Sequence, residues 1–279
     1  MTYATLIVQA DADEDGKTRI ALAAGLARRF GARLIGVAAR NLTPLVTAPL
    51  AGPVVVAALL ATEEKDIRKQ LAAAEQPLRA IAAEQGQRFS WRSAIENAAK
   101  VFASESRAGD LLVVGRRPES ASSQPSRHSD PGEVVLRAGR PVLVVPPGLS
   151  RFDAAHIVIA WKDSREAGRA VADGLSLLKR AIGVLVREIC DTAREQDNAK
   201  AAIDDVTDYL SRHGVAAAAE TRLLREGSVS AELLLAAERR GADLVAAGAY
   251  AHSRFHEWVF GGLTRALPGH FPKCCLLSH

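Results

Sequence analysis

The chain of 279 residues runs through the same order of elements twice. Residues 5–10 (TLIVQA) form a short apolar run before a polar turn and a helix-periodic segment, and residues 156–161 (HIVIAW) begin the same pattern. Further along, residues 108–115 (AGDLLVVG) match residues 241–248 (GADLVAAG). Self-similarity of this kind indicates two copies of one structural unit.

Each copy alternates short apolar strands with helices, in the order β-α-β-α-β-α-β-α-β. This alternation is typical of parallel sheets with right-handed crossovers. The predicted fold class is therefore α/β, with two tandem doubly wound domains, each a five-stranded parallel sheet with helices on both faces. We expect the domains at 1–148 and 154–279, with the boundary in the segment 146–155 (PPGLSRFDAA).

The first copy is longer than the second. Leu6 aligns with Ile157 and Leu112 with Leu244, which places about 19 extra residues in the first copy. They fall in the uncharged stretch 41–62, which is long enough to raise the question of a membrane span. Three prolines interrupt it, and proline inside a helix costs about 3 kcal/mol. We therefore expect an apolar loop that leads into a helix near 63–84 and packs over its own domain or at a subunit contact.

Composition excludes several classes of protein. Lys and Arg total 36 against 32 Asp and Glu, and this surplus is too small to predict binding to nucleic acid. The cysteines Cys190, Cys274 and Cys275 form no C-x-x-C pair, which disfavours a structural zinc site and fits a reducing compartment. The first residues are acidic where a signal peptide is basic. We expect a cytoplasmic protein with neither nucleic acid nor membrane as partner.

Ligands of open parallel sheets bind beyond the carboxyl ends of the strands. After the fourth strand of the second copy the sequence reads GAYAHSRFHEWVFGGLTRAL, from Gly248 to Leu267. Gly261 and Gly262 directly precede an expected helix, where backbone N–H groups and the helix N-terminus favour an anion. Further donors are available from His252, Ser253, Arg254 and Thr264.

This loop resembles the nucleotide motif of the universal stress protein family, G-x2-G-x9-G-(S/T). Gly248, Ala251, Gly261 and Gly262 stand at its four positions, with the spacing intact and two of the four residues matching. The resemblance covers nearly the whole chain as two tandem copies and implies an adenine nucleotide alpha hydrolase-like fold. It also implies ATP as ligand, with the adenine near the ends of the first two strands and the phosphates on the glycine loop. The nucleotide-binding residues predicted in this way are Ala160, Trp161, Lys162, Asp163, Gly248, Ala251, His252, Ser253, Arg254, Gly261, Gly262, Leu263 and Thr264.

The sequence also departs from the family pattern. Lys162 stands where the family commonly has a nucleotide-contacting aspartate, and Ala251 and Gly262 replace a glycine and a Ser or Thr. In the first copy Pro118 replaces the second glycine of the loop, so we expect the first domain to be degenerate. The resemblance further implies that the halves pair through their last strands, VLVV and CCLL, and it allows a homodimer.

Three functions remain open at this point. The first is a stress-adaptation protein that binds ATP in its second domain as a sensor or regulator. The second is a dimerisation or scaffold protein of the same fold that binds no nucleotide. The third, an enzyme with weak ATP hydrolysis, has least support, because no general base or metal-binding carboxylate pair can be assigned. We therefore predict no catalytic residue and no metal ligand; His252 and His256 lack the H-E-x-x-H order of a metal pair.

Overall fold

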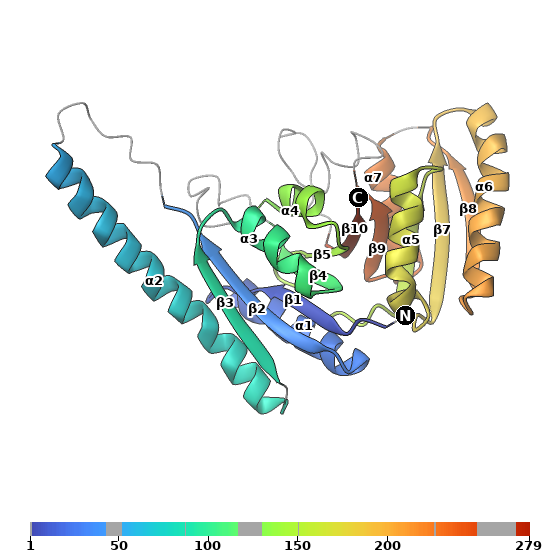
Figure 1. Cartoon of the computed structure of the whole chain (residues 1–279). Coiled ribbons are helices and arrows are strands. Elements are labelled where there is room, and N and C mark those ends of the chain that lie inside the picture. Colours follow the sequence, from blue (N-terminus) through green and yellow to red (C-terminus); the bar gives the residue numbers. More distant parts are fainter. Residues whose placement is uncertain are drawn as a thin grey trace. The chain divides into compact units, whose positions relative to one another are not determined.

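The computed structural model describes residues 2–42, 52–86, 88–116, 130–149, 151–225, 227–249 and 272–279 (Figure 1). The chain divides into two compact units, Ala4–Ala138 and a C-terminal unit of Gly139–His279 together with the residues up to Tyr3. Each unit is an α/β structure with mostly parallel strands flanked by helices, which confirms the predicted fold class. The domain bounds expected from the sequence, 1–148 and 154–279, refer to the two sequence repeats, and they stay a prediction.

The N-terminal unit has a parallel sheet with the strand order β3-β2-β1-β4. Helix α1 begins after Asp13, whose side chain accepts a hydrogen bond from the backbone N–H of Gly16, and ends at Gly31 in the left-handed conformation that glycine adopts readily. The elements are β1 (Thr5–Gln9), α1 (Glu14–Phe30), β2 (Arg33–Arg40), α2 (Pro53–Glu84), β3 (Phe89–Ile95), α3 (Ala98–Glu105), η1 (Ser106–Ala108), β4 (Leu111–Gly115) and α4 (Pro131–Ala138).

Helix α2 begins ten residues earlier than predicted. Residues 53–62, which we expected in a loop, form its first turns. Pro53 stands at the start of the helix, where proline is tolerated because the N–H it lacks has no partner within the helix. None of the helices among the described residues is both long enough and apolar enough to span a membrane.

The C-terminal unit has the strand order β5-β10-β9-β6-β7-β8. Strand β5, which we expected as the fifth strand of the first domain, lies in this unit and pairs antiparallel with β10, so that Val144 is opposite Cys275. The predicted contact between the segments VLVV and CCLL is thus confirmed. The elements are β5 (Val142–Val145), β6 (His156–Trp161), α5 (Arg165–Leu178), β7 (Gly183–Cys190), α6 (Ala193–Arg212), β8 (Ala217–Leu223), α7 (Val229–Arg239), β9 (Leu244–Gly248) and β10 (Cys274–Ser278).

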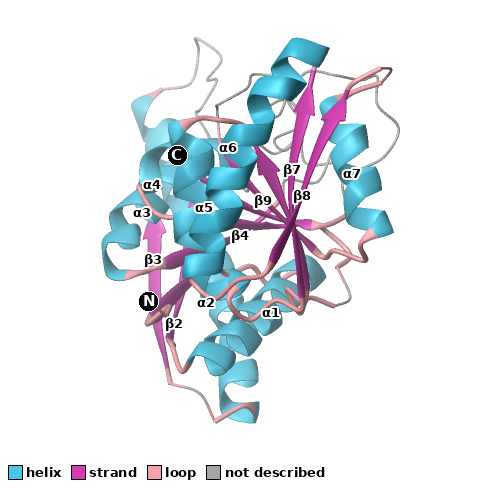
Figure 2. Cartoon of the chain, turned by 90° about the vertical axis from the view of Figure 1, so that its right-hand side faces the viewer, coloured by secondary structure: helices cyan, strands magenta, loops and turns pink. Residues whose placement is uncertain are grey.

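Helices cover both faces of the C-terminal sheet. Figure 2 shows α5 and α6 on one side of β7 and β8, and α7 on the other. Successive side chains of a strand point to opposite faces, so neighbouring residues of β7 meet different helices.

In each repeat, an aspartate at the corresponding position holds the backbone at or just before the first strand, β1 or β6. In the N-terminal unit Asp110 accepts hydrogen bonds from the backbone N–H groups of Ala4 and Thr5, at 2.8 and 2.9 Å. In the C-terminal unit Asp243 accepts two such bonds from Asp153 and Ala154, at 2.7 and 2.8 Å. Each aspartate directly precedes β4 or β9, so it ties the first strand of the repeat to the fourth.

Strand register gives the correspondence between the repeats. Ile7 lies beside Leu112, and Val158 lies beside Val245. Since Ile7 corresponds to Val158, Leu112 corresponds to Val245, one residue beyond the alignment made from the sequence. The paired aspartates Asp110 and Asp243 fit the same register.

Candidate functional site

A hollow opens at the carboxyl ends of β6, β7 and β9 in the C-terminal unit. Ala160, Trp161, Lys162, Arg187 and Gly248 are among the residues that line it. Apolar side chains complete its wall: Ala167, Ile189, Val229, Leu233 and Ala247. Three of the residues predicted from the first strand, and the first glycine of the loop motif, thus lie together in one place.

Lys162 is held by two carboxylates. Its ammonium nitrogen lies 3.4 Å from an oxygen of Glu188 and 3.8 Å from an oxygen of Glu195. The side chain of Glu188 is 4% exposed, and this burial raises the pKa of its carboxyl, while Lys162 acts to lower it. Lys162 therefore serves first as the counter-charge of a buried glutamate.

Arg187 forms a second ion cluster at the hollow. Its buried guanidinium lies 2.7 Å from Glu220 on β8 and 3.4 Å from Glu232 on α7. It therefore ties β7 to its neighbouring strand and to the helix on that face. Glu220 also pairs with Arg240, and Glu232 with Arg222. Among the described residues, both cations that line the hollow, Lys162 and Arg187, therefore already have carboxylate partners.

The other predicted residues of the first strand differ in role. Trp161 lines the hollow, and its buried indole nitrogen has no hydrogen-bond partner among the residues that the structure describes. Asp163 is exposed, and it does not line the hollow. The following Ser164 caps α5 by accepting a hydrogen bond from the backbone N–H of Ala167 at 3.2 Å.

Gly248 is required by packing. A Cβ atom at this position would lie 2.5 Å from the backbone nitrogen of Ala167 and 2.5 Å from the carbonyl carbon of Glu166. The end of β9 therefore rests directly on the first turn of α5. The remaining predicted residues lie outside the described part of the chain: Ala251, His252, Ser253, Arg254, Gly261, Gly262, Leu263 and Thr264.

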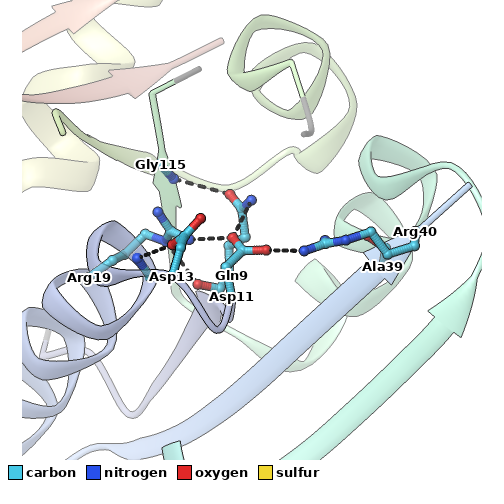
Figure 3. Close-up of polar contacts among 8 residues, drawn as sticks. Gln9, Asp11, Asp13, Arg19, Ala39, Arg40 and Gly115 are labelled. Carbon is cyan, nitrogen blue, oxygen red and sulfur yellow. Dashed lines mark hydrogen bonds and ion pairs between the residues drawn. The ribbon is translucent and has the colours of Figure 1, made fainter. Parts of the chain in front are cut away.

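The corresponding place in the N-terminal unit is filled by a buried polar network (Figure 3). Asp11 lies 2.5 Å from Arg19 and 2.5 Å from Arg40. Gln9 donates to Asp11 at 3.1 Å and accepts from the backbone N–H of Gly115 at 3.1 Å. Asp11 and Gln9 are almost completely buried, and their hydrogen bonds offset the cost of that burial.

The repeats differ in side-chain size around this place. By strand register and helix caps, Gln9 corresponds to Ala160, Arg19 to Ala170, and Arg40 to Cys190. In the N-terminal unit the Arg19 guanidinium fills the space beside Gly115, because a Cβ atom added to Gly115 would lie 2.2 Å from a nitrogen of that guanidinium. The corresponding C-terminal residues are small, and there the hollow is open.

No sequence motif pointed to these polar residues. Gln9, Arg19 and Arg40 were not among the predicted site residues, and neither were Arg187 and Glu188, which lie inside the strand GVLVREIC. Arg187 and Glu188 are adjacent charges within an apolar strand, and this signal would have identified them, since such charges are rarely buried without partners.

Comparison with solved structures finds the same fold along the whole chain. A universal stress protein from Archaeoglobus fulgidus DSM 4304 is 11% identical with a TM-score of 0.65, and the alignment covers 98% of this chain and 95% of that one. A functionally unknown protein from Pseudomonas aeruginosa PAO1 is 15% identical with a TM-score of 0.54, over 99% and 92% of the two chains. No protein-family model matches the sequence, and no curated protein matches it. Over nearly its whole length, the chain has the fold of the universal stress proteins.

Proposed function

We propose that the C-terminal unit binds an adenine nucleotide such as ATP and that the protein acts through this binding as a sensor or regulator in stress adaptation. The observation that carries the proposal is the hollow at Ala160 and Gly248, which lies where ligands of open parallel sheets bind. Its apolar walls suit a flat purine base.

The charges assign the parts of the nucleotide. Lys162 and Arg187 already pair with carboxylates, and most of the other lining residues are apolar, so we assign the uncharged base and ribose to the hollow. The phosphates then lie on the loop that follows Gly248, where the sequence spacing predicts backbone donors at 251–253 and 261–263. The N-terminal unit has no comparable role, because Gln9 and Arg19 occupy the corresponding space.

One observation favours the alternative, a scaffold protein that binds no nucleotide. Lys162 already has counter-charges from the chain itself, since Glu188 and Glu195 lie beside it. The two functions differ in whether the purified protein takes up a nucleotide, and native mass spectrometry answers this directly.

Titration calorimetry of the full chain with ATP, ADP and AMP tests the proposal. Ala160→Gln places in the hollow the side chain that fills the N-terminal unit, and we expect it to weaken binding at least about tenfold, a loss of roughly 1.4 kcal/mol. Ala201→Gln makes the same change at an exposed position of α6 and leaves binding unchanged. Both variants are checked for the parent's unfolding temperature.

Two further variants test the loop. Gly261→Trp places a bulky side chain in the expected phosphate position and abolishes binding, while Ala251→Gly restores the family's glycine and strengthens it. Binding that survives both Ala160→Gln and Gly261→Trp shows that the site lies elsewhere. Absence of binding in the parent and in Ala251→Gly favours the scaffold function.

A further inference from the structure

The side chains around the hollow of the C-terminal unit offer a ligand hydrogen-bond donors. Among the described residues that line it, only Trp161, Lys162 and Arg187 have polar side chains, and each of these carries N–H groups and no acceptor. The other lining residues are alanine, glycine, isoleucine, leucine and valine. A ligand group that enters the hollow therefore meets side-chain donors, but no side-chain acceptor, in the part of the wall that the structure describes.

Two of these donors have no partner. The ammonium group of Lys162 lies beside two carboxylates, and Nη1 and Nη2 of Arg187 lie beside Glu220 and Glu232. Nε of Arg187 and Nε1 of Trp161 are left: both atoms are buried, and neither has a hydrogen-bond partner among the described residues. The side chain of Arg187 as a whole is only 7% exposed.

Unpaired donors in a buried wall destabilise the ligand-free protein. A buried N–H group gives up its hydrogen bonds to water when the chain folds, and without a new partner this loss is not offset. Neither nitrogen is exposed to bulk solvent, so solvent does not supply the missing bond. Most buried polar groups in folded proteins are paired. Two unpaired donors on residues that line one hollow therefore point to an acceptor that arrives with the ligand.

The two donors come from adjacent strands. In the pairing of β6 with β7, Ala160 lies beside Arg187, and Trp161 lies beside Glu188. Trp161 and Arg187 are thus one step apart along a pair of strands that are about 4.8 Å from each other. Trp161 is the last residue of β6, so it stands at the edge of the sheet where ligands of such folds bind.

We propose that Trp161 and Arg187 recognise the base of the bound nucleotide by donating hydrogen bonds from Nε1 and Nε to two of its ring nitrogens. The inference rests on the proposed function, because it assigns the residues that select the base there. Adenine suits these donors, since its ring nitrogens N1, N3 and N7 carry no proton and accept hydrogen bonds. Trp161 thus contributes a specific bond in addition to apolar surface.

Titration calorimetry with ATP, and with analogues in which N1, N3 or N7 is replaced by C–H, tests the proposal. Two of the analogues are expected to bind the parent about fivefold more weakly than ATP, one for each donor. Trp161→Phe keeps an aromatic ring but removes the N–H, and it weakens ATP binding about fivefold. It leaves unchanged the binding of the one analogue that lacks the nitrogen bonded to Trp161. Trp91→Phe, the same change on β3 of the N-terminal unit, is the matched control and leaves ATP binding unchanged. The inference is wrong if Trp161→Phe binds ATP as tightly as the parent, if it weakens ATP and every analogue alike, or if fewer than two analogues bind the parent more weakly than ATP.

Magnetic resonance of the parent tests the hydrogen bond itself. The chain has three tryptophans, so nitrogen-15 labelling gives three indole N–H signals, and the signal of Trp161 is the one missing from the Trp161→Phe spectrum. ATP is expected to move this signal downfield, as hydrogen bonding does, and the analogue without the accepting nitrogen leaves it near its ligand-free position. ATP that binds in calorimetry without this shift overturns the inference and leaves the proposed function standing. If ATP does not bind at all, both are wrong.

Discussion

Asp11 and Lys162 occupy the same position in the two repeats, two residues before the helix cap, and carry opposite charges. Each is enclosed by two side chains of the other sign: Asp11 by Arg19 and Arg40, and Lys162 by Glu188 and Glu195. The central residue and its partners therefore carry opposite charges in the two repeats. Because buried charges need partners, a change at the central residue is tolerated only with matching changes around it.

Asp11→Asn is expected to destabilise the protein by about 3–5 kcal/mol, because it leaves the buried guanidinium of Arg19 and the partly buried guanidinium of Arg40 without their carboxylate. Asn keeps the shape of the side chain, so the loss reports the charge. Urea unfolding measures the change, and Glu14→Gln, in an exposed pair with Lys17, serves as the control with a loss below about 1 kcal/mol. A loss for Asp11→Asn as small as that of the control means that the cluster contributes little.

Gly248→Ala is expected to destabilise the protein more than Gly115→Ala. The new methyl group at 248 meets the backbone of Ala167 and Glu166, which cannot move without shifting α5. At 115 it meets the end of the Arg19 side chain, which can adjust. Overpacking costs typically about 1–3 kcal/mol, and we expect Gly248→Ala at the upper end of this range. Thermal unfolding of the two variants gives the order, and a reversed order contradicts the packing argument.

Asp110→Ala and Asp243→Ala are each expected to cost about 1–3 kcal/mol, because each leaves two backbone N–H groups at a strand start without their acceptor. The loss should appear as faster hydrogen exchange at those amides: Ala4 and Thr5 in one variant, Asp153 and Ala154 in the other. Asp197→Ala, which removes only an exposed pair with Lys200, is the control and leaves the exchange of these amides unchanged.

Glu188→Gln is expected to change how stability depends on pH. Burial raises the pKa of the folded Glu188 carboxyl above the ordinary value of about 4.5. Between these two values the folded protein binds a proton that the unfolded chain has released, so this residue makes stability fall as pH rises. Relative to the parent, the Gln variant therefore gains stability from about pH 4.5 upward and reaches a plateau above the folded pKa. Urea unfolding of parent and variant across this pH range tests the sign. If the free energy of unfolding of the Gln variant falls relative to that of the parent as pH rises, the argument is wrong.

Much of the fold was predictable because strands and helices follow from local periodicity. The apolar run at 156–161 is strand β6 (His156–Trp161), and the run at 5–10 is strand β1 (Thr5–Gln9), which ends one residue earlier. The start of α2 was not predictable in this way, because an apolar stretch with three prolines is as typical of a loop as of a helix. Its Pro53 proved to mark the first turn.

The sequence by itself determined the two repeats, the α/β class and the position of Gly248 at a strand end, because each depends on residues that are close along the chain. Only the tertiary structure decided which charges meet. Gln9, Asp11, Arg19, Arg40 and Gly115 come from three strands, a loop and a helix, and no spacing along the chain shows that they form one network. The same holds for Lys162, whose two carboxylates lie on β7 and α6. Electrostatic partners are chosen by distance in space, and parallel strands bring together residues that the intervening helices keep far apart in sequence.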